Sequence, residues 1–335
     1  MAPVYVREQG AVVRRQGERL VVTSDKKQLL DLPLLHVDQL ILFGNVQVTS
    51  QAVAMLLQAE VDVVFLSRYG KFRGRLMHTG SKFAKLRHAQ LQKLSDEAVT
   101  LAIARQVVVG KLHNQQALIQ QYLGEVSRPL QLQQAAGGIG RMLAQARSAG
   151  SLDSLRGYEG SAGASFWSAF RTLLPDEFGF QGRKYFPPPD PINALLSFGY
   201  SLLLKDVTAS VQVVGLDPYL GFFHTIDYGR PSLALDMMEE FRPVLVDPVV
   251  LSIVRAGEMS GSDFEQTGRP KQPVRLKERI MDHLIQKYEQ RSNEKFNHSD
   301  GGGQTTLRRI IELQVRRLAR LMLGQGKTYQ PFMIG

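Results

Sequence analysis

The sequence has 335 residues, enough for two domains, and its 44% hydrophobic and 21% charged residues are ordinary for a globular protein. It contains no cysteine, which excludes disulfides, thiolate metal sites and cysteine nucleophiles and suits a cytoplasmic location. The formal net charge of +10 favours a polyanionic partner, because lysine and arginine neutralise phosphates.

The first 80 residues predict a β-rich, sandwich-like domain. The strands expected from apolar or β-branched runs between turn formers are 4–6, 11–15, 20–22, 29–32, 39–43, 61–66 and 72–77, with one helix at 51–60. From residue 81 the apolar period becomes helical, so we expect a linking helix and a larger all-α domain over 81–335, an α+β protein as a whole.

Loops are expected in the helical part wherever glycine and proline gather: 136–140, 186–191, 229–231 and a mobile loop at 299–303 between the last two helices. The most apolar run, 192–204, is too short to span a bilayer and is interpreted as a buried core helix. The first residues show no signal-peptide pattern. We therefore expect no membrane partner.

Residues 151–250 contain more acidic than basic residues, whereas the segments on both sides have an excess of basic residues. Carboxylates that face DNA repel its phosphates unless a divalent cation lies between them, so this pattern fits a metal-dependent nucleic-acid enzyme. Alternatively, several of these acids cap helices, as Asp190 can, or lie on the solvated surface.

A helix predicted from an N-cap at Ser232 to about Phe241 places Asp236, Glu239 and Glu240 three and four residues apart on one face. Like charges so arranged repel each other, and a divalent cation would turn them into ligands. His224 lies just upstream and could face this helix. Histidine with carboxylates suits Mn²⁺ or Mg²⁺.

Two other polar features stay ambiguous. Glu159 stands near glycines among small residues, either at a solvent-facing turn or in a tight site. Asn193 and Tyr200 are two helical turns apart and could bond a substrate or the acidic site, or be satisfied inside a helical core. The sequence contains no phosphate-binding loop and no serine nucleophile elbow.

Three separated motifs can be read together: Arg-Gly-Tyr-Glu159-Gly, then Pro-Pro-Pro-Asp-Pro-Ile-Asn193-Ala-Leu-Leu-Ser-Phe-Gly-Tyr200, then Gly-Phe-Phe-His224 followed by Tyr-Gly-Arg-Pro-Ser-Leu-Ala-Leu-Asp236-Met-Met-Glu239-Glu-Phe-Arg-Pro. They resemble the CRISPR-associated adaptation integrase family. The strand-rich start, Lys111-Leu-x-Asn114 and Tyr329-Gln-Pro-Phe332 are also similar to that family, so the resemblance covers the whole chain.

The resemblance implies that Glu159, His224 and Glu239 hold a Mg²⁺ or Mn²⁺ ion, with His224 as a neutral ligand. It implies that Asp236 assists the metal or organises the site. Glu240 is then expected to be a solvent-facing or salt-bridged residue.

The resemblance further implies a metal-dependent DNA endonuclease and integrase that joins prespacer 3′-OH ends into a CRISPR array. Its partners would be double-stranded and branched DNA, a second copy bound through the β-rich domain, and a small CRISPR adaptation protein. The basic residues expected to contact DNA are Lys82, Lys85, Arg87, Arg183, Arg230, Arg308 and Arg309.

Two alternatives remain open from the sequence. A nuclease of branched DNA without integration would use the same ligands, and a non-catalytic DNA-binding scaffold would bind DNA equally well without metal. A small-molecule phosphohydrolase is disfavoured by the positive charge at both ends of the chain.

Overall fold

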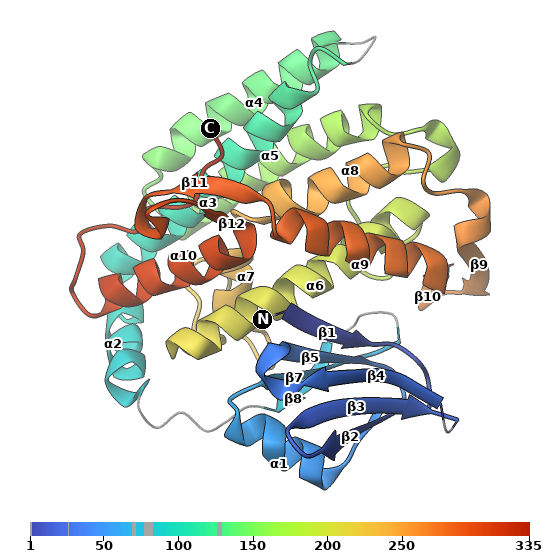
Figure 1. Cartoon of the computed structure of the whole chain (residues 1–335). Helices are drawn as coiled ribbons and strands as arrows, with labels where there is room; N and C mark the ends of the chain where they lie inside the picture. Colours follow the sequence, from blue (N-terminus) through green and yellow to red (C-terminus); the bar gives the residue numbers. More distant parts are fainter. Residues whose placement is uncertain (1, 26, 69–71, 77–82, 126–128) are drawn as a thin grey trace. The chain divides into compact units, whose positions relative to one another are not determined.

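The structure, a computed structural model, describes residues 2–25, 27–68, 72–76, 83–125 and 129–335 (Figure 1). It divides the chain into two compact units, Met1–Ser81 and Lys82–Gly335. The first unit is rich in strands and the second is mainly helical, which confirms the predicted fold class. Lys82, one of the expected DNA contacts, lies outside the described residues.

The described residues of the N-terminal unit form two four-stranded sheets and one α-helix. In one sheet the order is β1 (Ala2–Val6), β5 (Val37–Phe43), β7 (Asp62–Leu66) and β8 (Phe72–Leu76), and only the last pair is antiparallel. In the other it is β4 (Lys27–Pro33), β3 (Arg19–Ser24), β2 (Val12–Gln16) and β6 (Gln47–Val48), with a parallel β2–β6 pair. The helix is α1 (Ser50–Gln58), capped by the Thr49 hydroxyl.

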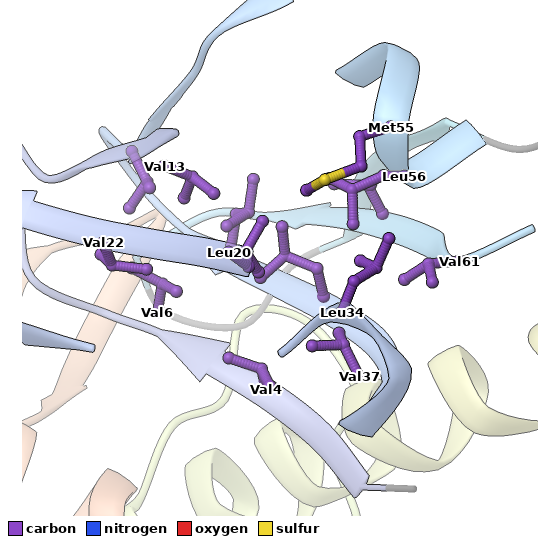
Figure 2. Close-up of a cluster of buried hydrophobic side chains, with 14 of the residues drawn as sticks. Val4, Val6, Val13, Leu20, Val22, Leu34, Val37, Met55, Leu56 and Val61 are labelled. Atoms are coloured by element: carbon purple, nitrogen blue, oxygen red, sulfur yellow. The ribbon is translucent and has the colours of Figure 1, made fainter. Parts of the chain in front are cut away.

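The two sheets enclose one hydrophobic core, as a sandwich does. Val4 from β1, Leu20 from β3 and Leu56 from α1 belong to a single buried cluster, shown in Figure 2. Leu20 and Leu56 are fully buried, at 0% exposure each. Alternate residues of each strand supply this core, because side chains along a strand point to opposite faces in turn.

The helices of the C-terminal unit are α2 (Ala84–Leu94), α3 (Glu97–Gln121), α4 (Pro129–Arg147), α5 (Leu152–Thr172), α6 (Pro191–Val214), α7 (Ser232–Met238), α8 (Asp247–Arg255), α9 (Glu278–Ser292) and α10 (Leu307–Met322). A π-helical turn, Arg242–Val246, joins α7 to α8. Figure 1 shows α4 lying along α5, with α3 packed against both.

The glycine-rich loop expected at 136–140 is wrong, because these residues lie inside α4. Their glycines allow close helix packing instead of a turn. A Cβ at Gly140 would lie 2.7 Å from the Gln116 amide of α3, and one at Gly138 would lie 3.1 Å from the Ser165 hydroxyl of α5. Tertiary packing therefore outweighs the low helix propensity of glycine here.

The apolar run 192–204 forms most of α6, which begins with an Asp190 cap and a proline at its first turn. By length and composition α6 could cross a membrane, but 67% of its most apolar stretch is buried inside the protein. We therefore describe α6 as the central core helix of this unit, as expected.

Two short antiparallel hairpins were not predicted in the helical unit. They are β9 (Phe264–Arg269) with β10 (Gln272–Leu276), and β11 (Lys295–His298) with β12 (Gly303–Thr306). The second includes the expected loop at 299–303, which forms the turn of the hairpin: a short 3₁₀ turn at Ser299–Gly301, and then Gly302 at a φ of 68°.

Candidate active site

Several hydrogen bonds hold Asp236 in place and join it to His224. The Asp236 carboxylate is 1% exposed and accepts hydrogen bonds from the backbone amides of Phe222, Phe223 and His224, at 2.6, 3.0 and 2.9 Å. The Nδ1 atom of His224 lies 2.7 Å from Asp236 Oδ1. Because an ionised carboxylate only accepts, Nδ1 donates this hydrogen bond, which leaves Nε2 as the ring nitrogen whose lone pair a cation can use.

Glu239 follows the last residue of α7 and is 3% exposed. Its Oε1 atom lies 3.7 Å from His224 Nε2 and 3.2 Å from Arg242 Nε. Burial opposes ionisation of this carboxyl, but the charges of Arg242 and Lys111 outweigh burial and lower its pKa to about 2. Glu239 is therefore an anion at neutral pH.

Lys111 of α3 joins Glu239 to Glu159 of α5. Its Nζ atom lies 2.6 Å from Glu239 Oε2 and also donates a hydrogen bond to Glu159 Oε1. Burial disfavours the charged ammonium, but the two carboxylates more than compensate and raise the pKa of Lys111. Glu159, predicted either at a turn or in a tight site, is thus within a helix and faces a second acid across a lysine.

The three expected ligands are neighbours in the fold, but the described part of the chain gathers no set of three or more His, Asp or Glu side chains placed to hold a metal ion as they stand. Their donor types fit a divalent cation all the same: two carboxylates and an imidazole nitrogen with a free lone pair. Glu239 Oε2 is also buried and accepts no well-aligned hydrogen bond from the described residues, even with Lys111 beside it.

Tyr200 reaches the site through Arg242. The Arg242 guanidinium lies 4.5 Å from the centre of the Tyr200 ring, and the Tyr200 hydroxyl donates to Asp247 Oδ1. Arg183 lies over the same ring at 5.3 Å and over Tyr185 at 4.6 Å. The Tyr200 hydroxyl is therefore satisfied inside the helical core, the second of the two sequence interpretations, while its ring supports the Arg242 guanidinium that contacts Glu239.

Asn193 is likewise satisfied inside the helical core. Its amide donates to Asp190 Oδ2 at 2.7 Å and to the Gly182 carbonyl at 2.9 Å. Its oxygen accepts from Arg183 Nη1 at 2.9 Å and from the Lys184 amide at 2.8 Å. These bonds fix the proline-rich approach to α6, so Asn193 is a satisfied buried polar group.

The expectation for Glu240 is wrong. Its carboxylate is 2% exposed and accepts hydrogen bonds from the Tyr329 hydroxyl at 2.7 Å and the Phe332 amide at 2.6 Å. Burial raises its pKa to about 7, against the effect of these hydrogen bonds. Glu240 thus binds the segment near the C-terminus that includes Tyr329 and Phe332.

The basic residues expected to contact DNA differ in their surroundings. Arg308 is paired with Asp206 and Glu289, and Arg309 is paired with Glu312. Arg87 donates to the Gly215 carbonyl at 3.3 Å, and Arg183 is held by Asn193 and Ser197. In the described part of the chain, the side chains of Lys85 and Arg230 make no hydrogen bond or ion pair.

Lys111 and Arg242 are site residues that the motif analysis did not assign. Lys111 was noticed only as part of a motif, although a lysine within the apolar run Val107–Leu112 predicts a buried partner of opposite charge. Arg242 lies three residues after Glu239, the spacing of a helical ion pair. The lysine within an apolar run and the Glu–Arg spacing are both visible in the local sequence, and they could have indicated buried ion pairs at this site.

Residues 4–290 match the family described as "CRISPR associated protein Cas1". The CRISPR-associated endonuclease Cas1 3 of Thermus thermophilus is 36% identical over 334 residues, covering 99% of this chain and 97% of that protein. The CRISPR-associated endonuclease Cas1 1 of Moorella thermoacetica is 31% identical over 336 residues, 98% and 97% of the two chains.

Among solved structures, a CAS1 protein from Thermotoga maritima superposes with a TM-score of 0.83 over 99% of this chain and 100% of that chain, at 23% identity. A "Cas6-RT-Cas1--Cas2 complex" matches 98% of this chain and 36% of that chain with a TM-score of 0.83 and 26% identity. The fold, the full-length relatives and the family match agree, and the chain belongs to the Cas1 family of CRISPR-associated proteins.

Proposed function

We propose that this protein is a metal-dependent DNA endonuclease and strand-transfer enzyme of CRISPR adaptation. Its full-length relatives are named as Cas1 endonucleases, which supports the nuclease activity. The observation that carries the assignment of the site is the buried Glu239 carboxylate, which lies beside His224 and shares Lys111 with Glu159. Such a gathering of anions in a basic protein suits phosphoryl transfer on DNA.

Glu159, the Nε2 atom of His224 and Glu239 would hold a Mg²⁺ or Mn²⁺ ion. Such an ion, when bound, neutralises charge on the scissile phosphate and lowers the pKa of the attacking hydroxyl. That hydroxyl belongs to water in DNA cleavage and to a DNA 3′ end in strand transfer. Attack forms one phosphorus–oxygen bond and breaks another, so both reactions use the same site.

Several residues of the chain prepare the ligands for this role. Asp236 fixes the His224 ring with its proton on Nδ1, so that Nε2 is free to bind a cation. Nε2 bound to a cation could not also accept a proton, so His224 is a ligand and not a general base. Arg242 holds Glu239 from the other side, while its guanidinium is supported by the Tyr200 ring. The ligands are thereby ordered before substrate arrives, which reduces the cost of reorganisation.

We further propose that the protein works in the cytoplasm on double-stranded and branched DNA, as a homodimer joined through the N-terminal unit. A similar structure is named as a complex containing Cas1 and Cas2, which supports a small adaptation partner of that kind for this chain. Lys85 and Arg230 are the expected phosphate contacts with no carboxylate partner among the described residues, and Arg230 is six residues from His224.

The test is a strand-transfer assay on a branched DNA that carries one labelled strand. Purified protein is incubated with Mn²⁺, Mg²⁺ or a chelator, beside His224→Ala and Glu239→Ala variants shown to be folded by circular dichroism. His283→Ala is the matched control, because His283 also pairs with a carboxylate, Glu258, but on the surface of α9. We expect metal-dependent joined products from the wild type and the control only.

The product separates the possibilities. A joined strand supports an integrase, and cutting without joining supports the nuclease of branched DNA. Metal-independent binding with no product from any variant would contradict catalysis and leave the DNA-binding scaffold. Activity that survives in both His224→Ala and Glu239→Ala would contradict the proposed site.

A further inference from the structure

The Lys111 ammonium lies between the two carboxylates of the proposed metal site, Glu159 and Glu239. It comes from α3, whereas Glu159 belongs to α5 and Glu239 to the end of α7. Its ammonium contacts one oxygen of each carboxylate. Two carboxylates brought this close repel each other strongly in a partly buried site, and one cation between them removes most of that repulsion.

The contact between the Lys111 ammonium and Glu239 is an ion pair with poor hydrogen-bond alignment. Glu239 Oε2 lies 2.6 Å from the ammonium, yet it accepts no well-aligned hydrogen bond among the described residues. An ammonium has three directional donors, whereas a metal ion can meet several oxygens at once. The site therefore holds Lys111 by charge without satisfying the oxygen completely.

Arg242, the other cation at Glu239, has a different environment. Its guanidinium contacts Glu239 alone of the two acids and is fixed against the Tyr200 ring. Lys111 has a flexible four-carbon stem and a compact charge, so its ammonium can move away without disturbing the backbone of α3. Of the two, Lys111 is the exchangeable cation.

We infer that Lys111 is the resident counter-ion of the metal-free enzyme and competes with the divalent cation for Glu159 and Glu239. This inference rests on the proposed metal site. It assigns Lys111 a positioning role. Its ammonium keeps Glu159 and Glu239 close together, and α3 packed beside α5, until metal is bound. The competition weakens metal affinity and stabilises the protein in the absence of metal.

The test is isothermal titration of Mn²⁺ into the folded full-length protein and its Lys111→Met variant, together with thermal melts with and without Mn²⁺. We expect Lys111→Met to bind Mn²⁺ at least tenfold more tightly than the wild type. The variant should melt at a lower temperature without metal and gain more from its addition, because ligand binding stabilises the folded state by mass action. Lys111→Gln serves in the same way should Lys111→Met not fold.

Lys205→Met is the matched control. Lys205 is another buried lysine of the helical unit, with its ammonium 2.9 Å from Asp206 on α6. Its loss should lower the melting temperature and leave the Mn²⁺ affinity unchanged. This control separates competition for metal from the general cost of deleting a buried ion pair.

Equal or weaker Mn²⁺ binding by the folded Lys111 variants, or no binding at all, would overturn the inference. Tighter binding in Lys205→Met as well would overturn it too, because the effect would then not be local. The DNA assay is read separately. Absence of DNA products with intact Mn²⁺ binding counts against the proposed function and leaves the comparison of affinities valid.

Discussion

Glu239 and Glu240 are neighbours in the chain and almost equally buried, yet their surroundings favour opposite charge states. Arg242 and Lys111 overcome the effect of burial and hold the pKa of Glu239 at about 2. No cation lies in direct contact with Glu240 among the described residues, and burial raises its pKa to about 7. Charge partners, and not burial, therefore determine which of the two acids is ready to bind a cation.

Replacing each acid by its amide tests this difference. We expect Glu239→Gln to reduce DNA joining by at least about 100-fold, because a neutral amide is a poor ligand for a hard cation. Glu240→Gln should stay within about threefold of the wild-type activity and cost roughly 1–2 kcal/mol of stability through poorer hydrogen bonds. Initial rates and urea unfolding measure the two effects, and equal loss of activity in both variants would contradict the assignment.

Asp247 gives a prediction for pH. It is 1% exposed, and burial, only partly offset by the hydrogen bond from Tyr200 and the charge of Arg242, raises its pKa to about 7. A carboxyl whose pKa is higher in the folded state binds more protons there, so it lowers stability as the pH rises. This cost is absent below the unfolded pKa of about 4 and complete above about pH 7.

Asp247→Asn removes that titration and keeps an oxygen to accept the Tyr200 hydrogen bond. We expect the variant to gain roughly 2–4 kcal/mol relative to the wild type between pH 4 and pH 8, since about three units of pKa are involved. Chemical denaturation at each pH measures the difference. A difference that stays constant across this range would show that folding does not raise the pKa of Asp247.

At the scale of elements, the C-terminal segment, residues 329–334, connects α3 to the turn that contains Glu239 and Glu240. The Asn114 amide of α3 donates to the carbonyls of Glu240 and Phe332, at 2.8 and 2.9 Å, and its oxygen accepts from the Ile334 amide at 3.0 Å. The Phe332 ring stacks on Phe241, with centroids 5.9 Å apart. Because Lys111 is one turn before Asn114, this segment also stabilises the position of Lys111.

We expect Asn114→Leu to destabilise the protein by roughly 2–4 kcal/mol, because it leaves two backbone carbonyls and one amide unpaired in a buried place. Asn297→Leu is the control, since Asn297 is an exposed residue of β11. Urea unfolding followed by circular dichroism gives both values. A cost below about 0.5 kcal/mol for Asn114→Leu would mean that water replaces the lost bonds.

The sequence could predict the elements whose apolar period is long and the residues that carry a motif. It predicted the strands of the N-terminal unit except the two-residue β6, the core helix over 192–204 and the fold class. It also named Glu159, His224 and Glu239, which the fold brings near one another, although their role as ligands stays a prediction. Local pattern is sufficient where packing and propensity agree.

The remaining features depend on contacts between distant segments. Nothing local shows that Gly138 faces Ser165 and Gly140 faces Gln116, so this glycine-rich stretch was interpreted as a loop. The hairpin β9–β10 consists largely of polar residues, so it lacks the apolar alternation of a strand. Lys111 meets Glu159 across 48 positions of sequence, and Glu240 meets Phe332 across 92.

For the molecule as a whole, a net charge of +10 does not mean that every basic residue is available to DNA. On α10 the guanidiniums of Arg309 and Arg316 pair with Glu312, while Arg317 and Arg320 pair with Asp300. A phosphate would have to replace a carboxylate at each of these positions. Basic side chains that have no such partner should contribute more to DNA affinity.

The dependence of DNA binding on salt measures this difference directly. Each phosphate contact releases condensed counterions and adds about 0.9 to the slope of log K against log salt concentration on duplex DNA. We expect Lys85→Ala and Arg230→Ala each to reduce the slope by about one, because these side chains have no partner among the described residues. Arg309→Ala should reduce the slope by clearly less than one, since Arg309 already shares Glu312 with Arg316. Fluorescence anisotropy at several salt concentrations gives the slopes.

A different outcome would contradict this assignment. If the slope falls by a full unit in Arg309→Ala and does not change in Lys85→Ala or Arg230→Ala, DNA displaces the acidic partners and binds along α10.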